Sequence, residues 1–524
     1  MSGERQERRV GTWRWELEPG FEPLLAAVLD SPGTMVKRIP DREVTRHQVD
    51  GRTFYLKCYR HGVHPWRALK YLVKAPRSRL EWELAPELVQ RGFAVVPHRA
   101  HGERWTARGL GETRLITEGP PGFEPLSGCP ALGTPEVQTV LGQFVRELHA
   151  AHVRHRDLRV ENLLYHPATL DLCLVDLDNI EIGPPLTRAQ RLDDLVMLRR
   201  RLELTPAFYA AYGGAWEQFA PEITRRARDR VRASAARRLW YCFSGGYSFA
   251  TGKWGGLTWY YREALLTPAL EAMMRDPDGF LESGIRLFKP GRSSTVGCAH
   301  GLVLKRYNLH RRRGILADLF RTARGCRAFQ RAWHLELLQV PTALPVAAAC
   351  RRRFGLARES YFVMREIPGA VSLLAWPSGD RTLVQRLASL LAQMHNDGFR
   401  HRDLKATNII LDAGGRPHFI DLDGLKHVGR VRRSRAVSDL ARLFHGLGQH
   451  AAPVSRTQRA RFLQRYCRDR DQEDWRPWWR AIDAAAAVLA ARQARQARKR
   501  PPPPPVTRRA SAIADTGPRR ESGV

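Results

Sequence analysis

The sequence contains an internal repeat, and this duplication constrains the fold more than any other feature of the chain. Short motifs from the first half return in the second half in the same order and at nearly the same spacing. The repeat unit is far too long for a solenoid, so the chain is expected to hold two copies of one globular domain. The paired landmarks are Phe54–Lys57 with Leu302–Lys305, His155–Asn162 with His401–Asn408, Leu174–Asp178 with Phe419–Asp423, and Asp193–Leu195 with Ser438–Leu440.

Each copy is expected to have the same internal organisation. β-branched and aromatic runs such as Thr53–Leu56 and Tyr361–Met364 come first, and helical periodicity follows in Val137–His149 and Thr382–His395. Strand-rich sequence followed by helix-rich sequence predicts an α+β fold, with a small strand-rich N-lobe and a helical C-lobe in each domain.

The expected domain boundaries follow from the repeat and from local composition. Arg275–Gly279 combines Asp, Pro and Gly and predicts a linker. Five consecutive prolines near the end of the chain predict a disordered basic tail. We therefore expect domain 1 over residues 13–276, domain 2 over residues 280–493 and the tail over residues 494–524.

Composition limits the classes of partner. The 524 residues include 86 Lys and Arg against 53 Asp and Glu, which gives a net charge of +33, and 43% of them are hydrophobic. That hydrophobic fraction is enough for large cores and excludes a mostly disordered basic protein. The charge favours an anionic partner, either nucleic acid, an acidic membrane surface or a phosphorylated ligand.

Targeting signals and cysteine spacing predict a cytoplasmic protein. The first ten residues are polar, no apolar secretory segment follows them, and no apolar run is long enough to span a membrane. The eight cysteines are dispersed and none forms a C-x-x-C pair. We expect reduced thiols and no structural metal site.

The repeated His-Arg-Asp-Leu-x-x-x-Asn motif indicates the chemistry. Followed by an apolar-Asp-apolar segment, it is the phosphoryl-transfer signature of the protein-kinase-like fold. In that arrangement a loop Asp accepts the proton of the attacking hydroxyl, an Asn and a second Asp bind Mg²⁺, and a strand Lys holds the α- and β-phosphates of ATP. The candidates are Asp157 and Asp403 for the proton, Asn162, Asp176, Asn408 and Asp421 for Mg²⁺, and Lys57 and Lys305 for ATP.

A kinase-like site also needs a glutamate that pairs with the strand lysine. In the first copy, Glu81 lies on a helical pattern after Lys57 and is the preferred candidate, with Glu83 as its competitor. The matching positions of the second copy hold Ala328 or Ala332, and Glu336 is the remaining alternative.

The turn that covers the phosphates is the least specific element, because no G-x-G-x-x-G precedes either lysine. In the second copy the candidate turn is Lys289–Gly297, where Gly291, Ser293 and Ser294 offer hydrogen-bond donors. The first copy offers only Ser31–Thr34. An ordinary turn is an equal alternative at both places.

The segment after the metal-binding Asp constrains the acceptor. Protein kinases carry a long activation segment ending in A-P-E, whereas the chain from Asp176 to Asp194 is short and contains no A-P-E. The second copy has the same short segment. This favours a small or membrane-bound hydroxyl acceptor over a protein serine or threonine.

Taken together, these residues resemble the lipopolysaccharide core kinases, the Kdo/heptose kinase family. The likeness lies in the His-Arg-Asp-Leu motif with (V/I)-D-L-D in place of D-F-G, and also in Lys305–Asn308 and Val340–Thr342. The resemblance implies a kinase-like fold and ATP- and Mg²⁺-dependent phosphorylation of a sugar hydroxyl in a lipopolysaccharide core glycolipid. It also implies work at the acidic cytoplasmic surface of the inner membrane.

Two features depart from that family. The members of the family are single domains, whereas this chain is a tandem. Because both copies keep the catalytic Asp, the Asn and the second Asp, at least one copy is expected to transfer phosphate. The second copy has Lys405 in the catalytic loop, which in this family often steadies the transferring phosphate, and the first copy has Arg159 at that place.

Two other functions stay open at this point. One is a bacterial serine/threonine protein kinase. The other is a non-catalytic kinase-like scaffold that binds anions such as nucleic acid, suggested by the arginine runs Arg225–Arg228 and Arg430–Arg433. No dedicated nucleic-acid motif accompanies these runs, and solvated surface is their ordinary interpretation.

Overall fold

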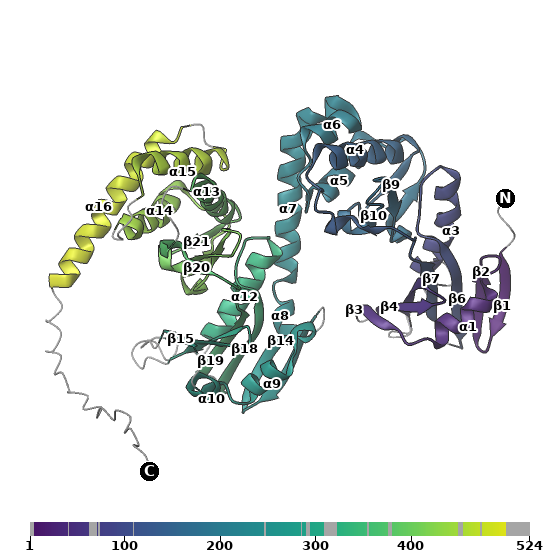
Figure 1. Ribbon diagram of the computed structural model, residues 1–524, viewed down its shortest axis with the longest axis horizontal. Helices are drawn as coiled ribbons and strands as arrows, with labels where there is room; N and C mark the ends of the chain where they lie inside the picture. Colours follow the sequence, from purple (N-terminus) through teal and green to yellow (C-terminus); the bar gives the residue numbers. More distant parts are fainter. Residues whose placement is uncertain are drawn as a thin grey trace, which may run out of the picture. The chain divides into compact units, whose positions relative to one another are not determined.

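The computed structural model confirms a duplicated α+β architecture (Figure 1). Two seven-stranded antiparallel sheets have the same strand order, β1-β2-β6-β7-β5-β4-β3 and β13-β14-β18-β19-β17-β16-β15. The structure describes residues 5–39, 41–61, 71, 74–107, 109–245, 248–283, 286–289, 294–308, 322–353, 356–375, 380–448, 454–471 and 474–498.

The first N-lobe is the first sheet with one long helix beside it. Its strands are β1 (Gln6–Val10), β2 (Trp13–Leu17), β3 (Thr34–Ile39), β4 (Arg42–Val49), β5 (Arg52–Arg60), β6 (His98–Thr106) and β7 (Gly109–Glu118), and its helices are α1 (Glu22–Asp30) and α3 (Arg77–Gln90).

Helices dominate the first C-lobe, where short strands carry the loops between them. The helices are α4 (Pro135–Ala150), α5 (Arg188–Arg199), α6 (Pro206–Gly213) and α7 (Ala220–Arg238); the strands are β8 (Glu124–Pro125), β9 (Val153–His155), β10 (Leu163–Tyr165), β11 (Leu172–Leu174) and β12 (Ile180–Ile182). The short helix α8 (Tyr241–Ser244) follows α7 and contacts the second sheet. Val137, Leu141, Val145 and Leu148 recur at helical spacing on α4 and are buried in the core of this lobe.

The second repeat has the same parts. Its N-lobe contains β13 (Phe249–Trp254), β14 (Leu257–Arg262), α9 (Pro268–Arg275), α10 (Pro277–Glu282), β15 (Arg286–Lys289), β16 (Ser294–Ala299), β17 (Leu302–Tyr307), α12 (Arg324–Leu337), β18 (Pro345–Arg353) and β19 (Leu356–Arg365). Its C-lobe contains β20 (Val371–Ser372), α13 (Arg381–Asn396), β21 (Phe399–His401), β22 (Ile409–Leu411), β23 (Pro417–Phe419), β24 (Leu425–His427), α14 (Arg433–Gly448), α15 (Arg456–Arg468) and α16 (Arg476–Arg498).

The sheets correct the expected domain boundary. Strands β13 and β14 precede residue 276 but are the first strands of the second sheet, as β1 and β2 are of the first. Trp15 and Trp259 occupy matching strands and are both fully buried. The second repeat therefore starts near Phe249, and Arg275–Gly279 is the junction of α9 and α10, where Asp276 caps α10, rather than a linker. The repeated sequence motifs all lie further along each repeat, so they could not indicate where the second repeat begins.

Contacts divide the chain into two compact units that do not coincide with the repeats. The first unit comprises Met1–Gln339 and Leu344–Glu366, and the second comprises Val340–Ala343 and Ile367–Val524. The first unit thus holds the whole first repeat and the second sheet. The second unit holds the second C-lobe, whose last helix runs to Arg498, past the expected start of the tail.

Two further properties bear on the environment of the protein. All eight cysteines lie in the described ranges, and none of them forms a disulfide. No helix in the part of the chain that the structure describes combines the length and the hydrophobicity of a bilayer-spanning segment.

Candidate active site

A buried cluster of opposite charges joins the two lobes of the first repeat. Lys57 Nζ on β5 lies 2.6 Å from Glu81 Oε1 on α3 and 2.6 Å from Asp176 Oδ1, which follows β11. Lys57 is 4% exposed and Glu81 1%. The structure therefore brings together three of the residues singled out from the sequence, each from a different element.

The charges in this cluster hold one another ionised. Burial favours the neutral form of Lys57, but Glu81 and Asp176 outweigh it and raise the pKa of the ammonium group. Burial also opposes ionisation of Asp176, yet Lys57 and then Arg42 keep the pKa of that carboxyl far below its usual range. The pKa of Glu81 is lowered, because Lys57 and His98 overcome the effect of burial.

The helix α3 decides between the two glutamates. Glu81 points inward to Lys57, whereas the Glu83 side chain is 54% exposed and lies 3.9 Å from Arg79 on the helix surface. Residues two apart on a helix face different directions, so only one of them reaches the sheet. The lysine pairs with Glu81.

Two residues at this site were missed by the sequence reasoning. His98 on β6 places Nε2 3.4 Å from Glu81 Oε1, while its Nδ1 lies 2.8 Å from the Val96 carbonyl oxygen. Arg42 on β4 donates to Asp176 at 3.3 Å. Both are polar residues on strands whose neighbours alternate inward and outward, and strand parity alone could have placed them on the site face.

Asp176 adopts a backbone conformation that non-glycine residues rarely take. Its φ and ψ are 57° and 67°, and those of Asp421 at the same place in the second repeat are 54° and 64°. Left-handed backbone costs on the order of 1–3 kcal/mol at a non-glycine residue and collects at functional positions. The same strained turn in both repeats aims the carboxylate of a metal-binding candidate.

The catalytic loops of the two repeats are built alike. Asn162 Nδ2 donates to the Asp157 carbonyl oxygen at 2.9 Å, and Arg159 donates to Asp157 Oδ2 at 2.6 Å. In the second loop Asn408 donates to the Asp403 carbonyl oxygen at 2.9 Å, and Lys405 Nζ lies 2.8 Å from Asp403 Oδ1. In each loop the cation two residues after the Asp therefore holds the carboxylate that is expected to act as base.

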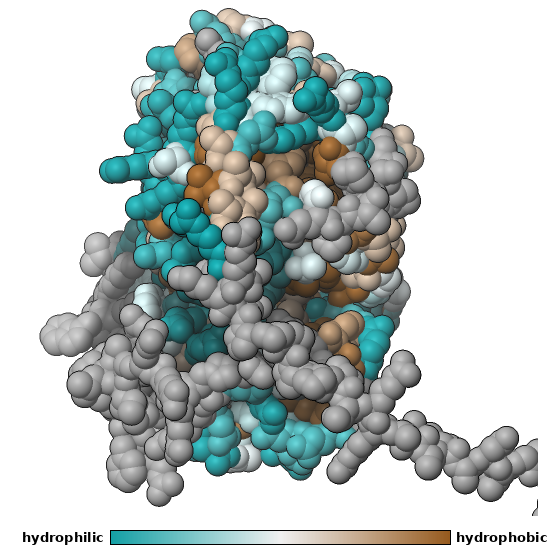
Figure 2. Space-filling view, turned by 90° about the vertical axis from the view of Figure 1, so that its left-hand side faces the viewer, coloured by the Kyte–Doolittle hydropathy of each residue, from teal (hydrophilic) through white to brown (hydrophobic). Residues whose placement is uncertain are grey.

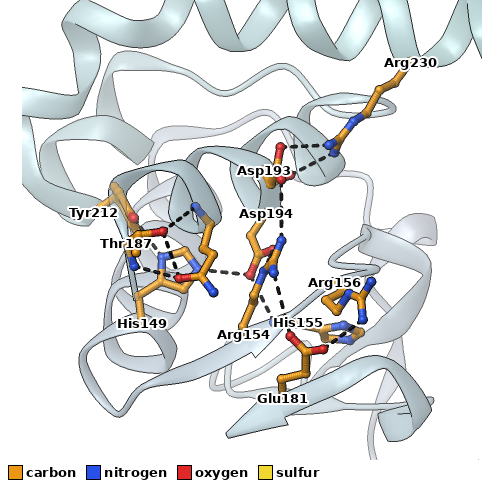
Figure 3. A network of polar contacts seen from close by, with 11 residues as sticks. His149, Arg154, His155, Arg156, Glu181, Thr187, Asp193, Asp194, Tyr212 and Arg230 are labelled. Carbon is orange, nitrogen blue, oxygen red and sulfur yellow. Dashed lines mark hydrogen bonds and ion pairs between the residues drawn. The ribbon is translucent and has the colours of Figure 1, made fainter. Parts of the chain in front are cut away.

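A buried aspartate anchors the backbone at the start of the first loop (Figure 3). Asp194 on α5 accepts a hydrogen bond from the His155 backbone N–H at 3.0 Å and lies 3.3 Å from His149 Nε2. His149 Nδ1 in turn lies 2.8 Å from the Tyr212 hydroxyl. Burial lowers the pKa of His155 to about 4, so the imidazole is neutral at physiological pH.

The second repeat reproduces this anchor. Asp439 accepts from the His401 backbone N–H at 3.0 Å and from Arg400 at 2.9 Å, and His395 Nδ1 lies 2.6 Å from the Tyr466 hydroxyl. The aspartates were already landmarks of the sequence repeat, but their histidine and tyrosine partners come from other helices. Only the packing of α4 with α6 and of α13 with α15 brings these partners together.

The second N-lobe differs from the first at the site itself. Val296 faces Lys305 across the strands as Val44 faces Lys57, so the register gives Ser294 as the counterpart of Arg42. Strands β6 and β18 start at equivalent places in the sheets, with Pro345 where the first repeat has His98.

Helix α12 also lacks the glutamate. The Gly325 N–H bonds Ser360 as Ser78 bonds Thr113, and this alignment puts Ala328 at the place of Glu81. Ala328 and Ala332 are both buried, and Glu336 bonds Arg262 at 2.5 Å. Glu336, the alternative glutamate proposed from the sequence, is therefore paired with Arg262.

The structure describes only some residues of the two candidate phosphate-covering turns. Gly291 and Ser293 lie outside the described residues, while Ser294 is a buried residue at the start of β16. In the first repeat Ser31 bonds the Val28 carbonyl oxygen and His47, at the end of β3 remote from Arg42.

The first site suits a magnesium-bound triphosphate. Lys37, Arg42 and Arg159 add cations around Lys57, and burial together with Arg42 lowers the pKa of Lys37. Among the described residues, Glu81 Oε2 is buried without a hydrogen-bond partner beside Lys57 and is free to accept one from a bound group. In the described ranges no three His, Cys, Asp or Glu side chains form a metal cage. Asp176 and Asn162 carry oxygen ligands of the kind that Mg²⁺ prefers, and they would hold the ion together with phosphate oxygens.

Comparisons with known proteins identify relatives of both repeats. The family model described as "Lipopolysaccharide kinase (Kdo/WaaP) family" matches residues 26–226 and 303–466. A 3-deoxy-D-manno-octulosonic acid kinase of Xylella fastidiosa is 34% identical over 88 residues, which are 16% of this chain and 34% of the relative. The lipopolysaccharide core heptose(I) kinase WaaP of Pseudomonas aeruginosa is 26% identical over 204 residues, 35% of this chain and 74% of the relative.

The extent of these matches is limited. The chain spans about a third of the length of the first curated relatives it matches, as the 34% coverage shows. A solved structure titled "WaaP in complex with acyl carrier protein" aligns with 23% sequence identity and a TM-score of 0.32, covering 41% of this chain and 98% of that one.

Proposed function

Because the chain belongs to the lipopolysaccharide kinase (Kdo/WaaP) family, we propose that it transfers the γ-phosphate of ATP to a sugar hydroxyl of a lipopolysaccharide core glycolipid. The observation that carries the proposal is the Lys57–Glu81–Asp176 cluster beside the Asp157–Asn162 loop. The acceptor sugar is Kdo or heptose, the sugars named for the relatives.

Each side chain has a definite part in this reaction. Asp157 accepts the proton of the sugar hydroxyl, and Arg159, 2.6 Å away, keeps that carboxylate oriented beside the transferring phosphate. Lys57, fixed by Glu81, contacts the α- and β-phosphates. Asp176 and Asn162 would hold Mg²⁺, which would neutralise charge on the phosphates.

The first repeat is proposed as the catalytic one. It has the complete set of Lys57, Glu81, Arg42 and His98 around Asp176, whereas the second repeat has Ala328, Ser294 and Pro345 at three of these places. A strand lysine without its glutamate is poorly positioned for ATP in kinase-like sites. The second repeat keeps Asp403, Asn408 and Asp421 and is proposed to be the weaker or regulatory copy.

The test is to change Asp157 and Asp403 to Ala separately and together, and to measure ATP-dependent phosphate transfer to purified core glycolipid. Loss of a general base lowers the rate by about 10²–10⁴-fold, which is expected for Asp157→Ala. Asp403→Ala is expected to keep most of the activity. A double variant as active as the unaltered protein would refute the proposal.

The acceptor and the location are tested separately. Casein in place of the glycolipid is expected to accept no phosphate, and lipopolysaccharide from a deletion strain is expected to lack one phosphate by mass spectrometry. Since the acceptor is a membrane glycolipid and the net charge is +33, we place the protein at the acidic cytoplasmic surface of the inner membrane. Release from membranes by high salt checks this location.

A further inference from the structure

The second C-lobe contains a cavity that the proposed reaction does not use. It has a volume of about 630 Å³ and lies between the segment that leads into α14, the end of α15 and the start of α16. We call it the arginine cavity, after Arg430, Arg432, Arg433, Arg435 and Arg470, which line it together with Trp478. No acidic residue is among the side chains that line it.

Four of the five arginines that line this cavity have no acidic partner among the residues that the structure describes. Arg430, Arg432, Arg433 and Arg435 form no ion pair with any residue in the described ranges. Arg433 lies over the Trp478 ring, 5.3 Å from its centroid, and Arg470 donates to the Val431 carbonyl oxygen, so the wall of the cavity is fixed. Like charges held this close repel, and an anion in the cavity removes that repulsion.

The first repeat provides an internal comparison for this segment. Helices α5 and α14 begin at equivalent residues, Arg188 and Arg433. Counting from these starts, Pro185, Thr187 and Gln190 stand where the second repeat has Arg430, Arg432 and Arg435. The remaining position is Arg188 in the first repeat, which faces Glu222 at 3.9 Å.

The first repeat shows whether the start of this helix needs arginines in order to fold. In the first repeat Thr187 and Gln190 form a capping box at the start of α5, an arrangement worth about 1 kcal/mol to a helix. The second repeat has arginines at both positions and so forgoes that stabilisation. The first repeat has only Arg188 in this segment, so the three additional arginines of the second repeat are not needed to start the helix.

We propose that the arginine cavity binds the phosphate groups of an anionic ligand, independently of the transfer reaction. The planar guanidinium group matches a phosphate with two parallel hydrogen bonds, and four such groups favour a ligand with more than one phosphate or a phosphate-rich surface. Figure 2 views the molecule from the left-hand side of Figure 1 and shows hydrophilic side chains over much of the described surface. The phosphate comes from a lipid headgroup or from a soluble phosphate, and the two are distinguished below.

The test variant replaces arginines at the start of α14 with the residues found at the start of α5. Arg432→Thr and Arg435→Gln introduce the capping residues of α5, and Arg430→Gln removes a third charge, so the fold is expected to be kept. The matched control removes three exposed arginines elsewhere on the same unit, Arg381→Gln, Arg456→Gln and Arg492→Gln.

Full-length protein is sedimented with phosphatidylcholine vesicles in which a fifth of the lipid is phosphatidic acid. Each arginine near an anionic surface contributes about fivefold in affinity, so the triple variant is expected to bind about 100-fold more weakly. The control is expected to bind like the unaltered protein. Arg430→Gln alone is expected to cost about fivefold. No described residue forms an ion pair or side-chain hydrogen bond with Arg430, so this variant guards against misfolding of the triple variant.

Pyrophosphate and a carboxylate lipid complete the experiment. Displacement of the protein from vesicles by millimolar pyrophosphate supports recognition of phosphate groups in free form, and retention on the vesicles supports a lipid headgroup. Equal losses in the triple variant and the control overturn the proposal. So does equal binding to vesicles whose negative charge comes from cholesteryl hemisuccinate, because then charge and not phosphate is recognised.

Discussion

The sharpest test of the first site is Glu81→Gln, which keeps the shape of the side chain and removes its charge. Removing one partner of a buried ion pair costs about 3–5 kcal/mol. Asp176 lies as close to Lys57 as Glu81 does, at 2.6 Å, and remains after the change. We therefore expect about 2–3 kcal/mol of local destabilisation, together with a fall in phosphate transfer of more than tenfold.

Hydrogen–deuterium exchange of peptides from α3 and β5 measures the local effect. A loss of about 2–3 kcal/mol corresponds to exchange that is about 30–150-fold faster. The control is Glu83→Gln on the same helix, whose exposed side chain makes an ion pair worth about 0.5 kcal/mol or less. If both variants exchange and react alike, the buried pair does not organise the site and the argument for it is wrong.

Three further predictions address the scaffold. Asp194→Asn, which weakens the anchor of the His155 N–H, is expected to lower the free energy of unfolding of the first C-lobe by about 1–3 kcal/mol in urea denaturation. The pKa of His155 is about 4 in the folded protein and about 6.5 in the unfolded chain, so its contribution to stability is complete above about pH 6.5 and is lost as the pH falls toward about 4. Melting temperatures across that range check this decline, and a flat profile would contradict it. Gly142→Ala places a Cβ 2.4 Å from the Phe208 carbonyl oxygen and is expected to cost about 1–3 kcal/mol, whereas Gly128→Ala, with open space around it, is the matched control.

The internal repeat made much of the architecture predictable from the sequence. The α+β fold and the helical face of α4 follow from residue periodicity, which is a local property of the chain. The kinase motifs identified the loops that hold Asp157 and Asp176, because those motifs lie in short contiguous segments. The start of the second repeat could not be predicted, since β13 and β14 carry no motif and are assigned only by the sheet they join.

The role of Glu81 could not be predicted fully from the sequence. Helical spacing placed Glu81 and Glu83 on one helix after Lys57, but only the packing of α3 against the sheet decides which of them turns inward. Arg42 and His98 reach the same charge cluster from β4 and β6, and no short motif links them to it.

The sequence by itself determined that this chain carries two kinase-like units with repeated Asp and Asn residues, because that information is written in contiguous motifs. The missing glutamate of the second copy was also visible in the sequence, but only the tertiary structure showed that Arg42 and His98 lack counterparts there. Strand register shows that Ser294 stands at the position of Arg42, and helix packing shows that Ala328 stands at the position of Glu81. The tertiary structure also gathered five arginines and Trp478, from three stretches of the chain, into one cavity. Contacts between residues far apart in the chain depend on register and packing, and neither can be read from spacing along the sequence.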